Sequence, residues 1–230
     1  VWQAYTEQWW RMDACYRQLH RAAVQAMKNP VAALDDELKS AVNAAEGLYK
    51  NWYLTGLERA WEQAAGSDLA AQGYVSGVDR QELFYMNEVG PLSKAGRVFV
   101  VVSDALRYEV ARELADALEG QTQGKTELAN MQAVFPSITK CGMAALLPHG
   151  NLGMQEGAAG TGLCVTADGL STASTENRQE VLRAKSEGAV AVRYDALMAM
   201  RKEERKQLVA PAKLVYVYHD QVDAVGDSAK

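Results

Sequence analysis

The segment 97–109 combines a continuous apolar run with a single aspartate and an immediate change to helical spacing. Residues 98–102 are all apolar and mostly β-branched, which is typical of a strand covered on both faces in a parallel sheet. Over 105–118, leucine or valine recurs every four positions, which predicts an amphipathic helix. We therefore expect Asp104 at the carboxyl end of a buried strand, the edge at which open α/β sheets bind ligands.

Two interpretations of Asp104 are open at this point. Aspartate is a preferred helix N-cap, so its carboxylate would accept a hydrogen bond from a backbone N–H of the first turn. Alternatively, a carboxylate fixed at a strand end can hold a divalent cation with little reorganisation. This segment alone favours capping, and two later segments change that balance.

Composition excludes several classes of protein. At 230 residues the chain is long enough for one α/β domain with an accessory element. Hydrophobic residues make up 48% and charged residues 23%, as in ordinary globular proteins. The formal net charge of −5 gives no overall basic surface, so charge alone does not argue for nucleic-acid binding.

The three cysteines, Cys15, Cys141 and Cys164, lie far apart in the sequence. Their odd number and the lack of CxxC spacing argue against a disulfide framework or a thiolate zinc site, and predict a reducing, cytoplasmic location. No apolar stretch approaches the ~20 residues that span a bilayer, and no signal peptide is visible, so no membrane partner is expected. Because the chain starts inside a helical pattern and stops after a loop signal, we expect a fragment of a longer protein.

Residues 1–95 predict an all-helical lead-in region. Apolar and aromatic residues recur in steps of three and four over 1–29, 34–52 and 57–64, and a short helix is expected over 83–89. All five tryptophans lie in this region. Aromatic residues at helical spacing form a core or a partner surface more often than a cofactor site.

Residues 96–230 alternate strands and helices, which predicts a mainly parallel sheet with flanking helices. The expected strands are 97–103, 128–134, 163–166, 189–192 and 213–218. The expected helices are 105–118, 140–147, 176–185 and 194–208. The fold class is therefore α/β, preceded by a helical region.

A second strand-to-helix segment, 135–150, places hydroxyl groups where the helix begins. Ser137 and Thr139 precede a run of small residues. Thr139 is expected at the helix N-terminus, where backbone N–H groups and the helix dipole favour an anion. A hydroxyl bound to a cation there can act as a nucleophile, because the metal lowers its pKa. The alternative is that Thr139 is only an N-cap.

The third segment, 216–227, again joins a strand to potential ligands. His219, Asp220, Asp223 and Asp227 follow one another within nine residues. Imidazole and carboxylates together suit zinc, manganese or a similar ion, although Asp-rich loops are common. In one parallel sheet the carboxyl ends of the three strands share an edge, so the joint pattern is more specific than any one segment.

These motifs resemble those of PglZ domains, which belong to the alkaline phosphatase superfamily and occur in bacteriophage-exclusion (BREX) defence systems. They read VFVVVSDALRYE (98–109), FPSITKCGMAALLPHG (135–150) and YVYHDQVDAVGD (216–227). The resemblance covers about residues 97–230 and extends to the helical lead-in, because PglZ proteins carry helical regions before this domain. It implies that residues 96–230 are the N-terminal part of an alkaline phosphatase-like domain.

The resemblance also implies roles for single residues. In that superfamily two metal ions activate a Ser or Thr nucleophile, which places the nucleophile and a metal contact on Thr139 and a ligand of one ion on Asp104. A later element binds the second ion, which implies Asp223 and Asp227 as ligands. Asp227 stands where the superfamily usually has histidine, which puts zinc in doubt and favours manganese or magnesium. A final Asp-His-Gly element is expected downstream of Lys230.

Two further residues have alternative interpretations. Arg107 lies three positions beyond Asp104 and is a candidate to bind a phosphate oxygen, with a structural ion pair as the alternative. His219 ends the last strand and would ligate a metal or orient Asp223. We expect His149 in a turn or core, and Cys141 lacks a visible base partner for a nucleophilic role.

The resemblance implies a metal-dependent phosphoryl-transfer hydrolase, a phosphodiesterase or nuclease-like enzyme, acting in bacterial antiphage defence. The expected substrate is DNA or an oligonucleotide, and the expected partners are other phage-defence proteins. The alternative is a non-catalytic scaffold of a BREX complex, in which the Trp-rich helices of 1–64 form the docking surface.

Overall fold

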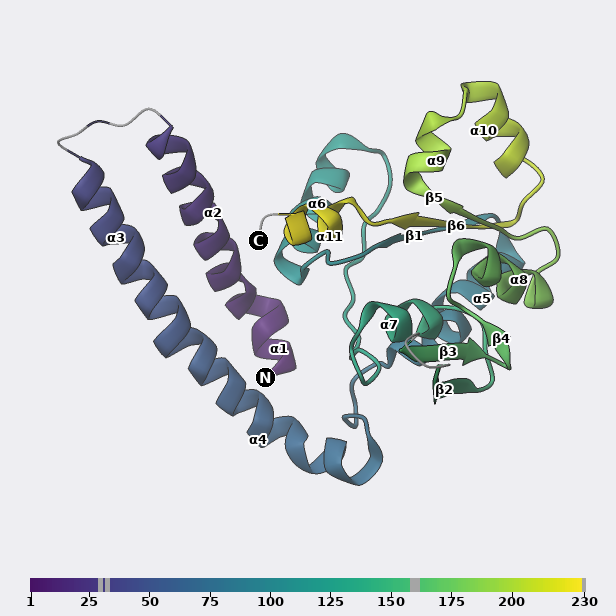
Figure 1. The fold of residues 1–230 in the computed structure, drawn as a ribbon, viewed down its shortest axis with the longest axis horizontal. Helices are drawn as coiled ribbons and strands as arrows, with labels where there is room; N and C mark the ends of the chain where they lie inside the picture. The colour runs from purple at the N-terminus through teal and green to yellow at the C-terminus, as the bar shows by residue number, and fades with distance from the viewer. Residues whose placement is uncertain (29–30, 32–33, 158–161, 229–230) are drawn as a thin grey trace. The chain divides into compact units, whose positions relative to one another are not determined.

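The computed structural model describes residues 1–28, 31, 34–157 and 162–228, and the side chains of Asp227 and Ser228 lie outside that description. The chain forms two compact units, which are described separately (Figure 1). The helical unit combines residues 1–76 with 107–130, and the sheet unit combines 77–106 with 131–230. This architecture confirms the predicted α/β fold with a helical N-terminal region, while the boundary at residue 95 stays a prediction.

The helical unit consists of two long helical runs and α6 (Tyr108–Gln121). The first run is α1 (Trp2–Ala4), the π-helical turns η1 (Tyr5–Trp9) and α2 (Trp10–Met27). The second run is α3 (Asp35–Gly47), η2 (Leu48–Leu54) and α4 (Thr55–Gln72). Helix α2 packs against both α3 and α6. The second run continues through Gly66 and ends at Gly73, whose φ of 78° is a left-handed conformation that glycine adopts without a Cβ clash.

Aromatic side chains connect the two runs of the helical unit. The rings of Trp2 and Trp61 stack at 4.2 Å, and those of Tyr16 and Tyr49 stack at 3.8 Å with an interplanar angle of 5°. Trp52, in contrast, is 68% exposed. The aromatic stripe predicted from the sequence therefore divides between packing and exposed surface.

The sheet unit contains a three-stranded parallel sheet of order β1-β6-β5. Its strands are β1 (Val98–Ser103), β5 (Val190–Arg193) and β6 (Leu214–His219). Val98 lies opposite Leu214 at the amino ends, and Ser103 lies opposite His219 at the carboxyl ends. The polar residues that follow β1 and β6 therefore reach the same edge, as the sequence predicts.

A second, antiparallel sheet has the order β2-β3-β4. Its strands are β2 (Leu152–Glu156), β3 (Leu163–Ala167) and β4 (Leu170–Ser171). The predicted strand 163–166 thus forms outside the parallel sheet. The predicted strand 128–134 is wrong, because this segment makes a single bridge between Gln132 and Arg80 instead of a ladder. Its Val134 N–H is satisfied by the Gln81 side-chain oxygen at 3.1 Å.

Short helices surround the parallel sheet. They are η3 (Gln81–Leu83), η4 (Tyr85–Val89), α5 (Gly90–Ala95), α7 (Thr139–Ala145), α8 (Thr175–Lys185), α9 (Tyr194–Ala199), α10 (Lys202–Val209) and α11 (Gln221–Ser228). Gly90 and Pro91 begin α5, where proline is tolerated because it lies in the first helical turn. The predicted helix 194–208 is two helices, since Met200 is extended. No helix in the described ranges is long and apolar enough to cross a membrane.

Alternate residues of β6 face two different hydrophobic clusters. Leu214, Tyr216 and Tyr218 join one cluster with residues of α7 and α8, while Val215 and Val217 join another with residues of α9 and α10. This central strand is therefore covered on both faces. In β1, Phe99 and Val101 are 52% and 63% exposed, so the coverage on both faces that its apolar run predicts is wrong for this strand.

Tyr216 connects the sheet to the end of α7, and this contact yields a testable prediction. Its buried hydroxyl donates a hydrogen bond of 2.9 Å to the Leu146 carbonyl. We expect Tyr216→Phe to lower the free energy of unfolding by about 1–2 kcal/mol, because that carbonyl loses its donor. Tyr218→Phe is the comparison, since the buried Tyr218 hydroxyl donates to no acceptor among the described residues and its ring keeps the contact with the Arg178 guanidinium at 4.8 Å. Equal losses in denaturant unfolding of the two variants would contradict the assignment.

Candidate functional site

A pocket of about 250 Å³ opens at the carboxyl edge of the parallel sheet. Asp104 lines one side at the end of β1, and Thr139 lines the other at the start of α7. Gln81 of η3, Ser103 of β1 and Ser137 complete the polar part of the wall. The structure therefore brings together two residues that separate sequence motifs single out.

Asp104 is held in a tight turn and not in a helix cap. Its backbone N–H donates to the His219 carbonyl at 2.9 Å, which extends the β1–β6 pairing by one residue. Its carboxylate accepts a hydrogen bond of 3.0 Å from the Ala105 N–H, and Ala105 has a left-handed φ of 58°. Helix α6 begins only at Tyr108, with Arg107 as its N-cap residue. The capping interpretation of Asp104 is therefore wrong.

Thr139 is the first residue of α7, and Ile138 is the N-cap. The Ile138 carbonyl accepts hydrogen bonds of 3.0 Å from the N–H groups of Cys141 and Gly142. The exposed Thr139 hydroxyl makes no hydrogen bond to the part of the chain that the structure describes, so it does not act as a cap. Buried Cys141, Ala144 and Ala145 pack α7 against β3, which fixes the position of Thr139.

His219 is oriented by neighbours on both sides. Its Nδ1 lies 2.9 Å from the Ser103 hydroxyl, and the ring of Tyr194 contacts its ring edge-on at 4.9 Å and 83°. The next residue, Asp220, forms an ion pair of 2.9 Å with Arg193. The Ser103–His219 pair lies at the edge where β1 and β6 end, next to Asp104.

The predicted second-ion ligands are in α11. Asp223 is partly buried and is not among the residues that line the Asp104 pocket, and the side chain of Asp227 lies outside the described residues. Across the described ranges, no group of three or more His, Cys, Asp or Glu side chains is placed to hold a metal ion. The Asp104 carboxylate and Thr139 hydroxyl supply oxygen donors that suit a hard divalent cation, but two donors are fewer than such an ion takes. The metal assignments therefore stay predictions.

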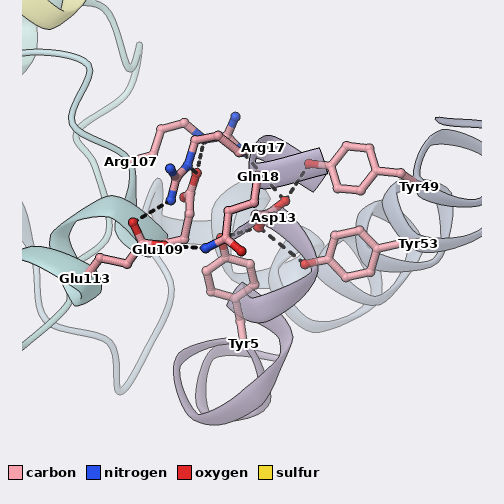
Figure 2. Close-up of polar contacts among 9 residues, drawn as sticks. All are labelled: Tyr5, Asp13, Arg17, Gln18, Tyr49, Tyr53, Arg107, Glu109 and Glu113. Carbon is pink, nitrogen blue, oxygen red and sulfur yellow. Dashed lines mark hydrogen bonds and ion pairs between the residues drawn. The ribbon is translucent and has the colours of Figure 1, made fainter. Parts of the chain in front are cut away.

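Arg107 takes part in a buried polar cluster of the helical unit (Figure 2). Its Nε lies 3.0 Å from the Glu109 carboxylate, and its Nη2 lies 3.6 Å from Asp13. Asp13 also accepts hydrogen bonds from the hydroxyls of Tyr5 at 2.6 Å and Tyr49 at 2.5 Å. The ion-pair alternative for Arg107 is thus present in the structure, and phosphate binding by Arg107 stays a prediction.

The remaining candidates behave as expected of structural residues. Cys141 is buried, and burial raises the pKa of its thiol, which opposes a nucleophilic role. His149 has its Nδ1 2.7 Å from the Leu147 carbonyl, in the turn after α7. The pH dependence of any activity is therefore not expected to follow the ionisation of Cys141.

Three polar residues at this edge escape sequence reasoning. Gln81 lies inside the expected helical lead-in, where nothing indicates that η3 approaches α7. A Cβ added at Gly142 would lie 3.4 Å from the Gln81 amide, so the glycine in the small-residue run is the one local signal of this close approach. Ser103 and Ser137 lie beside Asp104 and Thr139 in the sequence, but no pattern of their own indicates a role for them.

Comparison with known proteins defines the family. The fold and site describe an α/β domain with candidate ligands at the carboxyl edge of a parallel sheet. Residues 84–230 match the family described as the BREX system PglZ alkaline phosphatase-like domain, so the chain belongs to the PglZ family. The resemblance seen in the sequence motifs is thereby confirmed.

Two curated relatives match along nearly the whole chain. The Alkaline phosphatase-like protein BrxZ of Escherichia coli O9:H4 (strain HS) is 37% identical over 99% of the chain. The Alkaline phosphatase-like protein PglZ of Bacillus cereus (strain H3081.97) is 33% identical over 100% of the chain. The chain spans 26% of the length of each. No solved structure matches it.

Proposed function

We propose that this chain carries the first part of the active site of a metal-dependent phosphoryl-transfer hydrolase that acts in antiphage defence. One observation carries the proposal: Asp104 and Thr139, from motifs far apart in the sequence, line one pocket at the carboxyl edge of the sheet. Family membership supports it, because the matching domain is described as alkaline phosphatase-like and as part of the BREX system.

In the proposed reaction, Thr139 is the nucleophile. Its exposed hydroxyl is free of hydrogen bonds to the described residues, so its oxygen can approach a phosphorus atom in line with the leaving alcohol. The Thr139 hydroxyl loses its proton as its oxygen bonds to phosphorus, the P–O bond to the leaving group breaks and the leaving oxygen takes up a proton, and water then splits the P–O bond to Thr139. The tight turn at Asp104 and the packing of α7 hold the two reacting walls of the pocket in place.

The proposed binding position of the divalent cation is beside Asp104. Asp104 and the Thr139 oxygen would hold one ion, with Asp223, Asp227 and residues further along the full-length protein completing the centre. A divalent cation bound there supplies charge neutralisation and a lower hydroxyl pKa. All-oxygen donors favour manganese or magnesium over zinc. His219, held by Ser103, is placed to orient a neighbouring ligand or the substrate.

We propose a phosphodiester substrate, DNA or an oligonucleotide, and other phage-defence proteins as partners. The family's description as part of a BREX system supports the defence context. The relatives' names support alkaline phosphatase-like chemistry for those proteins. The substrate class follows from the defence context and not from any basic surface, since the chain's net charge is −5.

A chromogenic phosphodiester assay tests the proposal. Full-length protein supplied with manganese, zinc or magnesium is expected to hydrolyse bis(p-nitrophenyl) phosphate, and a chelator is expected to stop the reaction. Asp104→Asn is expected to lower kcat/KM about 100-fold or more, because the amide lacks the charge that holds the cation. Asp195→Asn is the control, since this exposed carboxylate pairs with Arg193 away from the pocket lining. Metal-independent turnover, or equal loss in both variants, would sink the assignment.

A second candidate function is supported by the helical unit. A groove of about 540 Å³ there is lined mainly by apolar residues, including Trp9, Met12, Trp52 and Leu57. Exposed tryptophan of this kind is enriched where proteins dock to one another. If the assay shows no turnover, the scaffold hypothesis predicts that Trp52→Ala weakens assembly with other defence proteins while the fold is retained.

A further inference from the structure

The amino edge of the parallel sheet carries a second pocket, of about 640 Å³, in the sheet unit. Lys213 precedes β6, Lys185 ends α8 and Ser186 follows it, and Lys94 lies in α5, which leads into β1. Asp104 and His219 mark the opposite, carboxyl edge. Six-residue strands separate the two edges by roughly 17–20 Å, so this pocket is not part of the Asp104 site.

The lining of this pocket is strongly cationic. It contains three lysines and no Asp or Glu among the described residues, although the whole chain has a net charge of −5. Lys94 and Lys213 form no ion pair with any residue in the described ranges, and Lys185 lies 3.6 Å from one oxygen of Asp168. Three lysines from separate elements around one pocket favour an anionic ligand, because their potentials add there.

The other walls offer flat and apolar surface. Tyr85, Met86 and Pro91 come from η4 and the start of α5, and Pro148 comes from the turn after α7. Met86 is 63% exposed. A ligand with a phosphate chain and an attached ring would contact lysines with the first part and this surface with the second.

We propose that this pocket binds a small polyphosphate anion, with Lys94, Lys185 and Lys213 contacting phosphate oxygens. Lysine ammonium groups bind phosphate as point charges, and several of them converge best on a ligand that carries several negative charges. Inorganic polyphosphate and a nucleoside triphosphate share this chemistry. The site is independent of the proposed hydrolase function, because none of its residues lines the Asp104 pocket.

Isothermal titration calorimetry of the full-length protein tests the proposal with two probes, tripolyphosphate and ATP. A chelator in the buffer removes any metal-dependent binding at the Asp104 site. Saturable binding with a Kd below about 1 mM is expected for at least one probe at low ionic strength. Tighter binding of ATP identifies the ring as part of the ligand, and equal binding identifies the phosphate chain alone.

Variants decide whether binding occurs at this pocket. The double variant Lys94→Ala/Lys213→Ala is expected to raise Kd about 10-fold or more. Lys202→Ala/Lys206→Ala is the matched control, because these exposed lysines lie on α10 of the same unit and do not line the pocket. The control is expected to bind like the wild type. Absence of saturable binding, equal weakening in both double variants, or weakening by Asp104→Asn instead would overturn the proposal.

Discussion

Thr139→Ala is expected to lower the kcat for phosphodiester hydrolysis about 1,000-fold or more, because it removes the oxygen that attacks phosphorus. The substitution is expected to leave the fold intact, since the hydroxyl is exposed and makes no hydrogen bond within the described residues. Thr139→Ser retains the nucleophilic oxygen and is expected to keep measurable turnover. Rates under saturating substrate and metal, with circular dichroism as the check on folding, measure the effect.

Ser137 supplies the matched control for this prediction. It is an exposed hydroxyl two positions before Thr139 and lines the same pocket. Ser137→Ala is expected to change kcat by less than about 10-fold, because a neighbouring hydroxyl contributes binding and not bond formation. Loss of activity in Ser137→Ala with retention in Thr139→Ala would transfer the nucleophile assignment to Ser137.

The parallel sheet could be predicted because its strands carry strong local signals. The apolar runs that become β1, β5 and β6 are short and rich in β-branched residues. After each of them the hydrophobic pattern changes to that of a helix. The segment 128–134 is predicted as a further strand, but its hydrogen bonds go to the start of η3 and the residues just before it, including that from the Gln132 N–H to the Asp79 carbonyl at 2.7 Å. Such pairing depends on residues some fifty positions away, which local periodicity does not report.

The sequence pattern does not predict strand β2, for a comparable reason. It contains Gly153, which disfavours a strand on propensity alone. A Cβ at Gly153 would lie 2.5 Å from the Thr166 hydroxyl, so glycine is required where β2 pairs with β3. The requirement comes from the partner strand, and the sequence of β2 by itself gives no sign of it.

Of the candidate site, the sequence predicts only which residues lie at the carboxyl ends of the strands. Asp104 and Thr139 meet in one pocket because a strand and a helix both present their ends at the same edge. The contact of His219 with Ser103 follows from strand register, which the motifs do not specify. The predicted roles of Asp223 and Asp227 came from family resemblance and that of Arg107 from its position three residues beyond Asp104, and their test lies in metal-binding and kinetic measurements.

Asp13→Ala is expected to lower the free energy of unfolding of the helical unit by about 2–4 kcal/mol. The Asp13 carboxylate is buried and accepts hydrogen bonds from Tyr5 and Tyr49 (Figure 2). Removing it leaves both hydroxyls and the charge of Arg107 with one partner fewer. Denaturant unfolding followed by tryptophan fluorescence isolates this unit, since all five tryptophans lie in it.

Because of the pKa of Tyr49, the stability that this cluster contributes depends on pH. Burial, followed by the hydrogen bond to Asp13, raises the pKa of Tyr49 to about 12. A tyrosine whose pKa is higher in the folded state than in the unfolded state stabilises the fold. This stabilisation is fully present below the pKa of the unfolded state, about 10, and is lost as the pH rises towards 12. The difference in stability between wild type and Asp13→Ala is therefore expected to hold at neutral pH and to shrink above about pH 10.

A double-mutant cycle separates the Asp13 contacts from general helix effects. Asp13→Ala and Tyr49→Phe are expected to couple by about 1 kcal/mol or more, because each removes one partner of the same hydrogen bond. Asp36→Ala removes an exposed aspartate of α3 that lies 3.8 Å from Lys39, and it is expected to change stability by less than about 0.5 kcal/mol. The family match begins at residue 84, so Asp13 lies before it while Arg107 and Glu109 lie within it. Additive effects of Asp13→Ala and Tyr49→Phe would mean that the hydrogen bond between these two side chains does not contribute to stability.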